Sequence, residues 1–360
     1  MSRLPIPTEE ELVTRLRRGD VVFPPLRLVG GESKAREIDA IVRMSWQKKS
    51  FQFAAECKRQ SNPRTIEAAA GQVRERAQER KLLPLVVVPY LGEQALEALE
   101  TRSVSGLDLC GNGVIIVPGE WYIRRTGNPN LFRAEGVIKN VYRKSSSGVA
   151  RLFLARPEFD SVQDALDELG RRGGRVTLST VSKVCKRLED DLIIERKRAG
   201  ATRLRLVQPE KLLDRLAANY SAPEVKCRLA GKLRGIEPPE FRARLRAWAQ
   251  ETGNQVALTG ASSVGAYAVM ARAGAEEYYC TDVAGAVRAL GDRFQPAERF
   301  ATVSLLETRD EEVYFDRGED LTASPVQTFL ELSSGDKRDR ETADQVRRVI
   351  LTAPAPLTTR

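Results

Sequence analysis

Residues 36–60 have the sequence REIDAIVRMSWQKKSFQFAAECKRQ, in which apolar and polar residues alternate on both sides of a short polar segment. This alternation predicts two paired β-strands, joined at residues 47–50. Residues two positions apart on a strand share a face, so Glu56 and Lys58 are expected to point the same way. Asp39 lies on the neighbouring strand, where the right register brings it beside them. Two carboxylates and one ammonium group at a sheet end form a site suited to Mg²⁺ and an activated water.

The elements expected around this hairpin follow a definite order. They are a helix at 9–18, strands at 26–29, 38–44 and 51–57, a helix at 64–80 and a strand at 85–89. This α-β-β-β-α-β order, together with Asp39 and the tripeptide Glu56-Cys57-Lys58, resembles the PD-(D/E)XK nuclease superfamily, which has the restriction-endonuclease-like fold. The resemblance covers residues 8–125.

The resemblance implies roles for particular residues. Asp39 and Glu56, with the carbonyl of Cys57, would hold Mg²⁺ or Mn²⁺; Lys58 would position the attacking water, and Gln72 on the following helix would support them. Some members carry an extra carboxylate on the first helix, which Glu10 or Glu11 could match. Thr8 and Glu11 also form the pattern of a capping box, and we favour that structural role for Glu11.

The E-x-K tripeptide is weak by itself, because this highly charged chain contains it at several other places. Glu56 differs from the others because an apolar strand runs into it and an acid stands on the preceding strand. The alternative interpretation is a solvated hairpin end with a surface ion pair, as most charged residues are. Domains of this fold also serve as inactive binding scaffolds, so the resemblance leaves catalysis open.

Composition sets the broad class of the protein. A chain of 360 residues is expected to form two or three domains. Its hydrophobic content of 42%, without a long apolar run, predicts a soluble globular protein with no membrane span. The N-terminus lacks an apolar signal segment, which predicts a cytoplasmic location. The net charge of +9 suggests a polyanionic partner, with nucleic acid as the first expectation.

The chain contains no histidine, which excludes several kinds of catalytic site. Ser-His-Asp triads, Cys-His dyads, histidine-based zinc sites and histidine-metal nucleases all need an imidazole. The five cysteines are far apart and form no C-x-x-C pair, so disulfides and a cysteine-based zinc site are not expected. Phosphodiester chemistry in this chain must therefore use carboxylates, lysine and a hard metal ion.

Residues 151–222 have the layout of a winged helix-turn-helix. Helices are expected at 161–171 and from 177 to about 189, followed by strands at 192–196 and 203–207 that form a basic hairpin. The stretch 171–205 contains eleven Lys and Arg residues against four Asp and Glu residues. Such a unit places its second helix in the major groove and its wing on phosphates. The alternative is a solvated basic face or a winged helix that contacts protein.

The predicted DNA contacts lie on the second helix and on the hairpin. On the helix, the polar residues face outward, while Val181, Val184, Cys185 and Leu188 face the core. The predicted contact residues are Ser179, Ser182, Lys183, Lys186, Arg187, Arg196, Lys197, Arg198, Arg203 and Arg205.

Three later segments carry a second resemblance. They are GASS at 260–263, YCTDV at 279–283 and SPVQ at 324–327. Following a winged helix, they resemble the AbiEi family of type IV toxin–antitoxin antitoxins, over residues 151–350. In that family a winged helix precedes a domain related to nucleotidyltransferases. Here a single acid, Asp282, follows the turn, and Cys280 stands where a second carboxylate is needed, so a degenerate domain is expected. Gly260 and Ser262 would form a helix N-terminus able to bind an anion.

These features predict a multidomain α/β and α+β protein. The predicted parts are a nuclease-like domain at 1–125, a linker at 126–150, a winged helix-turn-helix at 151–222 and a nucleotidyltransferase-like domain at 223–360. The first functional hypothesis is a Mg²⁺-dependent DNA endonuclease targeted by the winged helix. The second is an antitoxin-like transcriptional repressor of a toxin–antitoxin or phage-defence locus, with an inactive nuclease-like domain. DNA is the expected partner in both; a cognate toxin protein is a further candidate partner, and the sequence leaves a homodimer open.

Overall fold

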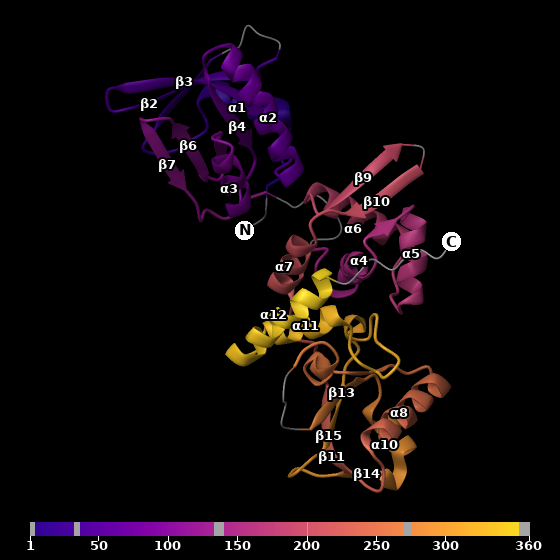
Figure 1. Ribbon diagram of the computed structural model, residues 1–360. Helices are drawn as coiled ribbons and strands as arrows, with labels where there is room; N and C mark the ends of the chain where they lie inside the picture. Colours follow the sequence, from indigo (N-terminus) through magenta and orange to yellow (C-terminus); the bar gives the residue numbers. More distant parts are fainter. Residues whose placement is uncertain (1–3, 32–36, 133–139, 200, 270–274, 353–360) are drawn as a thin grey trace. The chain divides into compact units, whose positions relative to one another are not determined.

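The computed structural model describes residues 4–31, 37–132, 140–199, 201–269 and 275–352 (Figure 1). The backbone divides into two compact units. The first is Met1–Lys139 with Asp190–Leu192, and the second is Asn140–Glu189 with Ile193–Arg360. Both units mix helices with β-sheets. The coarse prediction of a multidomain α/β protein is therefore confirmed.

The first unit is built on a seven-stranded mixed sheet within the described residues, in the strand order β1-β2-β3-β4-β5-β6-β7. Strands β3, β4 and β5 are parallel neighbours, and the other neighbouring pairs are antiparallel. The elements are α1 (Glu9–Arg18), β1 (Arg27–Gly31), β2 (Ala40–Trp46), β3 (Lys49–Cys57), α2 (Pro63–Glu79), β4 (Leu83–Val88), α3 (Glu93–Thr101), β5 (Ser105–Asp108), β6 (Gly113–Val117) and β7 (Trp121–Arg125).

Helices cover both faces of this sheet. One core places Leu12 and Leu16 of α1 against Val87 of the sheet. The opposite core contains the apolar residues of α2 and α3 together with Val86 and Val88. Because β4 is covered on both faces, its sequence is a nearly continuous apolar run rather than an alternating one.

Local signals in the sequence fix the ends of α1 and its close approach to the sheet. Thr8 and Glu11 form both hydrogen bonds of the predicted capping box, and Gly19 ends the helix in the left-handed conformation. Glycine is required at position 30, because a Cβ atom there would lie 2.2 Å from the carbonyl oxygen of Leu16. The β1 backbone can therefore pass directly beneath α1.

Asp108 is buried at the end of β5 and anchors the turn that follows. Its carboxylate accepts hydrogen bonds from the backbone amides of Leu91, Cys110 and Asn112, and from the Asn112 side chain, at 2.8–2.9 Å. A carboxylate satisfied in this way has a structural role in the turn.

The second unit begins with a small helical and stranded segment. Its elements are α4 (Lys144–Ala155), β8 (Glu158–Phe159), α5 (Val162–Arg171), α6 (Leu178–Asp190), β9 (Ile194–Ala199), β10 (Ala201–Leu206) and α7 (Pro209–Asn219). The three strands form a sheet in the order β8-β10-β9. The linker predicted at 126–150 is wrong over residues 144–150, which form the first turns of α4; the serines at 145–147 had favoured a loop. In the structure Ser147 and Val149 are buried.

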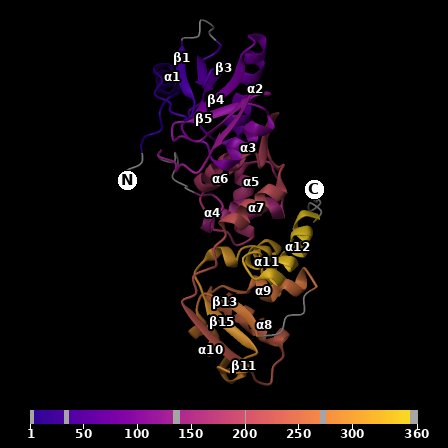
Figure 2. The ribbon, with the colours of Figure 1, turned by 90° about the vertical axis from the view of Figure 1, so that its left-hand side faces the viewer.

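The rest of the second unit surrounds a five-stranded sheet, in the order β12-β13-β15-β11-β14. Its elements are β11 (Cys227–Leu233), α8 (Pro238–Thr252), β12 (Val256–Leu258), α9 (Gly260–Ser263), β13 (Glu276–Cys280), α10 (Val283–Leu290), β14 (Phe294–Pro296), β15 (Val303–Glu307), α11 (Pro325–Ser333) and α12 (Lys337–Thr352). Helices α8 and α10 pack on one face of this sheet around Phe241, Trp248 and Tyr278 (Figures 1 and 2).

A buried polar chain joins α4 to α11 inside the second unit. Arg151 is 3% exposed, and its Nη1 donates to Gln327 Oε1 at 2.7 Å and to the Glu312 carbonyl at 2.9 Å. The Nε2 of Gln327 donates in turn to Glu331 Oε1 at 2.8 Å. Burial lowers the pKa of Arg151. A buried guanidinium is tolerated only when it is hydrogen-bonded, so this chain fixes α4 and α11 against each other.

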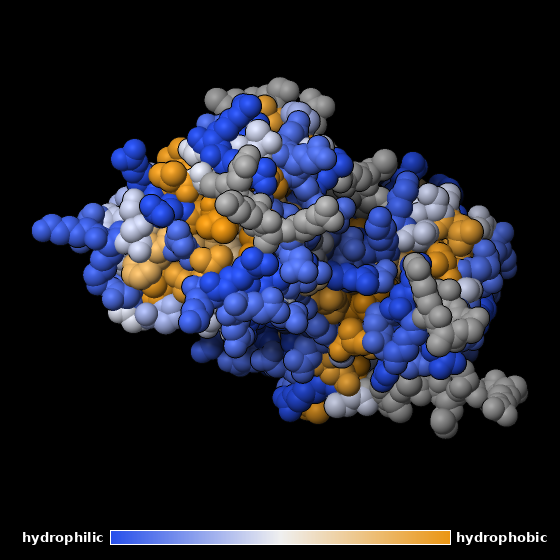
Figure 3. All heavy atoms as spheres, turned by 90° about the horizontal axis from the view of Figure 1, so that it is seen from above, coloured by the Kyte–Doolittle hydropathy of each residue, from blue (hydrophilic) through white to orange (hydrophobic). Residues whose placement is uncertain are grey.

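The visible surface in the space-filling view is largely hydrophilic, with apolar residues in limited areas (Figure 3). None of the helices in the described part of the chain combines the length and the apolar character that crossing a membrane requires.

Candidate functional site

The pairing of β2 with β3 brings Asp39 to the end of β3. Ala40 pairs with Ala55, so Asp39, which directly precedes β2, comes opposite Glu56. The Oδ2 atom of Asp39 accepts a hydrogen bond from the backbone amide of Cys57 at 2.8 Å. The register expected from the sequence therefore places Asp39 against the E-x-K tripeptide.

Glu56 is the most buried charged residue of this group, at 4% exposure. Its Oε1 lies 2.8 Å from Lys58 Nζ, so the two side chains share a face of the strand as predicted. Its Oε2 lies 2.7 Å from Nη1 of Arg76 on α2. The structure thus gathers Asp39, Glu56 and Lys58 at one end of the sheet, and adds a second cation to the group.

The resemblance predicts Gln72 for the supporting role, and the sequence gives no signal for Arg76. Gln72 is exposed, and Arg76, one helical turn later, is the α2 side chain that reaches Glu56. Both positions flank the apolar stripe that includes Val73 and Ala77. The helical period places either residue equally well on the side of α2 that faces Glu56. The residue type does not single out Arg76 either, because the chain contains 58 basic residues.

A further carboxylate approaches the site from the first helix. Glu9 Oε1 accepts a hydrogen bond from the backbone amide of Arg59 at 3.3 Å. Glu11, by contrast, is engaged in the capping box, as favoured from the sequence. If an acid of α1 assists this site, the residue is Glu9 rather than Glu10 or Glu11.

The electrostatics of the group favour a charged lysine. Burial alone would lower the pKa of Lys58, but its hydrogen bond to Glu56 and the negative charges of Glu56, Glu9 and Asp39 outweigh burial and raise that pKa. Burial raises the pKa of the Cys57 thiol, and the charges of Asp39 and Glu56 raise it further. Lys58 is thus an ammonium donor and not a general base at neutral pH, and Cys57 is a neutral thiol and not a nucleophile.

The carboxylate oxygens at this site are of the kind that a hard divalent cation prefers. Asp39 and Glu56 supply the carboxylates. Cys57 directly follows Glu56, and its backbone amide donates to Asp39. Within the described ranges, no cluster of three or more Cys, Asp or Glu side chains is arranged to hold a metal ion. Two carboxylates suffice for Mg²⁺, which usually keeps several waters and takes further oxygens from a substrate phosphate. Asp39 and Glu56 therefore fit Mg²⁺ or Mn²⁺ if waters and substrate phosphate oxygens supply the remaining ligands.

Helix α6 has the two faces expected of it. Val181, Val184, Cys185 and Leu188 are buried, as predicted. The predicted contact residues of this helix are exposed: Ser179, Ser182, Lys183, Lys186 and Arg187. These residues give α6 one exposed face that is polar and basic.

The basic side chains of the β9–β10 hairpin lie on two opposite faces of the three-stranded sheet β8-β10-β9. Lys197, Arg203 and Arg205 are exposed. Arg196 is mostly buried on the opposite face, where its Nε lies 3.8 Å from Glu189 Oε2 of α6, so it does not point outward with the other predicted contacts of the hairpin. Strand alternation explains the difference, because position 196 shares its face with buried Ile194. The side chain of Arg198 lies outside the described residues.

The predicted anion site at Gly260 is filled by the chain itself. The backbone amide of Ala261 donates to Glu331 Oε2 at 3.2 Å. Asp282 caps α10 by accepting from the Gly285 amide at 2.8 Å, and Cys280 is buried. The turn and the single acid that suggested nucleotide chemistry therefore both have structural partners.

Comparison of the chain with known protein families, with characterised proteins and with solved structures finds no match. The two family resemblances rest on the residues quoted above.

Proposed function

We propose that this protein is a DNA-binding, Mg²⁺-dependent nuclease with a restriction-endonuclease-like domain and a DNA-binding winged helix. The observation that carries the proposal is the convergence of Asp39, Glu56 and Lys58 at one end of the sheet. The order α1-β1-β2-β3-α2-β4 supports the fold assignment, because it matches the α-β-β-β-α-β core of that superfamily. The sheet pairing supports it too, with β3 antiparallel to β2 and parallel to β4.

Each side chain has a role that follows from its contacts. Asp39, Glu56 and the Cys57 carbonyl would hold the metal ion, which when bound lowers the pKa of a coordinated water and polarises a phosphodiester. Lys58, charged and 2.8 Å from Glu56, can donate a hydrogen bond to the attacking water or to phosphate oxygens. Arg76 neutralises Glu56 and fixes its rotamer through Oε2, so it is a positioning residue.

The second unit would deliver the nuclease to DNA. The order α4-β8-α5-α6-β9-β10 with a three-stranded sheet is the layout of a winged helix, in which α6 is the recognition helix. The exposed face of α6 carries Lys183, Lys186 and Arg187 beside two serines. Basic and hydroxyl side chains on such a helix suit contacts to phosphates and base edges.

The alternative function is a repressor with an inactive nuclease-like domain, as in an antitoxin. The specific observation in its favour is that both carboxylate oxygens of Glu56 are engaged by cations, Lys58 and Arg76. Such a closed ion-pair group can simply stabilise the end of the sheet. The two proposals share DNA binding and differ in cleavage.

Cleavage in the presence and absence of metal separates them. Supercoiled plasmid and linear duplex DNA would be incubated with the protein in Mg²⁺, in Mn²⁺ and in EDTA. The nuclease proposal predicts nicked or linear products with either metal and none with EDTA. Intact DNA in all three conditions, with the protein bound to it, would favour the repressor.

Replacing Lys183 and Lys186 by glutamine should weaken DNA binding about tenfold at moderate salt. Losing two phosphate contacts should also reduce the slope of log affinity against log salt by about two. Fluorescence anisotropy over a salt series measures both quantities. The double variant Lys226→Gln/Lys337→Gln is the control, because it removes two exposed lysines of the same unit elsewhere. Equal losses in the two variants would mean that α6 is not the DNA-binding element.

A further inference from the structure

Among the described side chains, the outer face of the three-stranded sheet β8-β10-β9 carries as many acids as bases. Phe159 of β8 and Leu204 of β10 are buried, so the residues on either side of them point outward. On β9, Lys197 pairs with Arg203 and Glu195 pairs with Arg205 in the register of the hairpin. The outward-pointing charged residues are Glu158, Asp160, Glu195, Lys197, Arg203 and Arg205.

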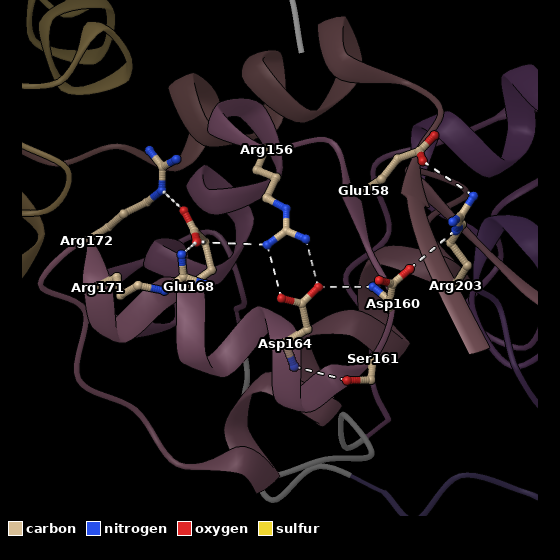
Figure 4. A network of polar contacts seen from close by, with 9 residues as sticks. All are labelled: Arg156, Glu158, Asp160, Ser161, Asp164, Glu168, Arg171, Arg172 and Arg203. Atoms are coloured by element: carbon tan, nitrogen blue, oxygen red, sulfur yellow. Dashed lines mark hydrogen bonds and ion pairs between the residues drawn. The ribbon is translucent and has the colours of Figure 1, made fainter. Parts of the chain in front are cut away.

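Glu158 of β8 and Asp160, which follows β8, lie against the two arginines of β10. Arg203 is 3.5 Å from Asp160 and 3.9 Å from Glu158 (Figure 4). Arg205 is 3.3 Å from Glu158. All four side chains are about half-exposed or more. The basic character expected of the wing is therefore cancelled on this face by residues of a strand that precedes it by about forty positions in the sequence.

The acids are held in place by contacts of their own segment. Arg156 donates two hydrogen bonds to the Asp164 carboxylate, at 2.9 and 3.0 Å (Figure 4). Its guanidinium group also lies over the Phe159 ring. The backbone amide of Asp160 donates to the same Asp164 carboxylate at 3.1 Å, and Ser161 caps α5. Two-point guanidinium–carboxylate pairs are geometrically specific. The segment that carries Glu158 and Asp160 is therefore fixed at both of its ends.

We propose that Glu158 and Asp160 compete with DNA phosphates for Arg203 and Arg205, and so keep the wing weakly engaged with DNA. The inference rests on DNA binding by the second unit. A phosphate that approaches either arginine meets a carboxylate already there, and must displace it. Most of the affinity would then come from contacts that the exposed residues of α6 make with DNA.

The size of the effect follows from the exposure of these groups. Exposed ion pairs are individually weak, so a DNA phosphate can replace the carboxylate at each arginine. The net binding free energy gained is smaller than at an unpaired arginine, because the existing ion pair is lost. Two negative charges within one Debye length of the bound backbone also repel it, and this repulsion fades as salt rises. Neutralising both acids should therefore raise affinity most at low salt.

The test is the double variant Glu158→Gln/Asp160→Asn, with duplex DNA of random sequence as the probe. Affinity should rise about three- to tenfold at low salt. The slope of log affinity against log salt should become steeper by about one to two, which corresponds to one or two additional phosphate contacts. The matched control is Glu240→Gln/Glu251→Gln on α8, which changes the net charge equally through exposed acids elsewhere in the unit. An equal rise in the control, or no rise in the test variant, would overturn the inference.

A double-mutant cycle with Arg203→Gln/Arg205→Gln isolates the competition. In the wild-type background this change should alter affinity by less than about twofold, since the acids already engage both arginines. In the Glu158→Gln/Asp160→Asn background it should remove most of the gain, and only the part caused by long-range repulsion should remain. A gain that persists undiminished without the arginines would show that the acids act only through long-range repulsion and would overturn direct competition.

The binding experiments distinguish failure of the proposed competition by Glu158 and Asp160 from failure of the proposed DNA binding. If the α6 lysines matter and the acids do not, DNA binding stands and the competition is refuted. If wild-type protein binds no DNA but the Glu158→Gln/Asp160→Asn variant does, the competition is supported in its strongest form. If neither protein binds, both proposals fail.

Discussion

Replacing Lys58 by alanine should lower the rate of Mg²⁺-dependent DNA cleavage by about two to three orders of magnitude. The raised pKa of Lys58 keeps its ammonium group charged at neutral pH, so the variant loses a fixed donor at the reacting centre. DNA affinity should change little, because the DNA-binding face is assigned to α6. Initial rates on supercoiled plasmid, measured beside anisotropy on the same protein, give both values.

Lys49→Ala is the matched control for this change. Lys49 stands at the opposite end of the same strand, β3, and is exposed in an ion pair with Glu120. Its removal takes away a lysine of equal charge without touching the Asp39 and Glu56 group. Cleavage by Lys58→Ala at the wild-type rate would exclude Lys58 from the reaction and would leave the ion pair with Glu56 as its whole role.

Replacing Arg151 by alanine should destabilise the second unit by about 3–5 kcal/mol. The change removes a buried guanidinium, leaves a cavity, and strands the Gln327 amide oxygen and the Glu312 carbonyl without a donor. Gln327 is fully buried, so water cannot readily replace the lost hydrogen bond. Urea unfolding of the full chain measures the loss.

Two further variants separate the causes of this loss. Arg151→Met refills most of the volume but leaves both acceptors unpaired, and should lose about 2 kcal/mol. Arg347→Ala removes another arginine of the same unit, whose partner Asp214 is exposed, and should lose less than about 1 kcal/mol. Equal losses of unfolding free energy for Arg151→Ala and Arg347→Ala would contradict the structural role given to the buried hydrogen bonds of Arg151.

The nuclease-like site was largely predictable because its signals are local. Alternation along residues 38–57 fixes the strand faces, and the hairpin register then brings Asp39 to Glu56 and Lys58. Arg76 was not predictable, because which residue of α2 reaches Glu56 depends on how the helix rotates as it packs on the sheet. Several side chains of α2 satisfy the same helical period.

The charge of the wing shows a different limit. Counting charges over the continuous stretch 171–205 predicted a strongly basic surface. In space, the neighbours of Arg203 and Arg205 come from β8, which pairs with β10 across the sheet. Likewise, Glu331 reaches the Gly260 turn from seventy residues away along the chain. Composition over a window cannot detect partners that only sheet pairing and helix docking bring together.

The most direct test of the central claim is one preparation of Asp39→Asn, compared with wild type for both DNA binding and Mg²⁺-dependent cleavage. The amide preserves the shape of Asp39 and can still accept the hydrogen bond from the Cys57 amide, but removes the charge that would hold the metal ion. The account predicts unchanged affinity for duplex DNA and cleavage lowered by at least about a hundredfold. Cleavage by the variant at the wild-type rate would contradict it.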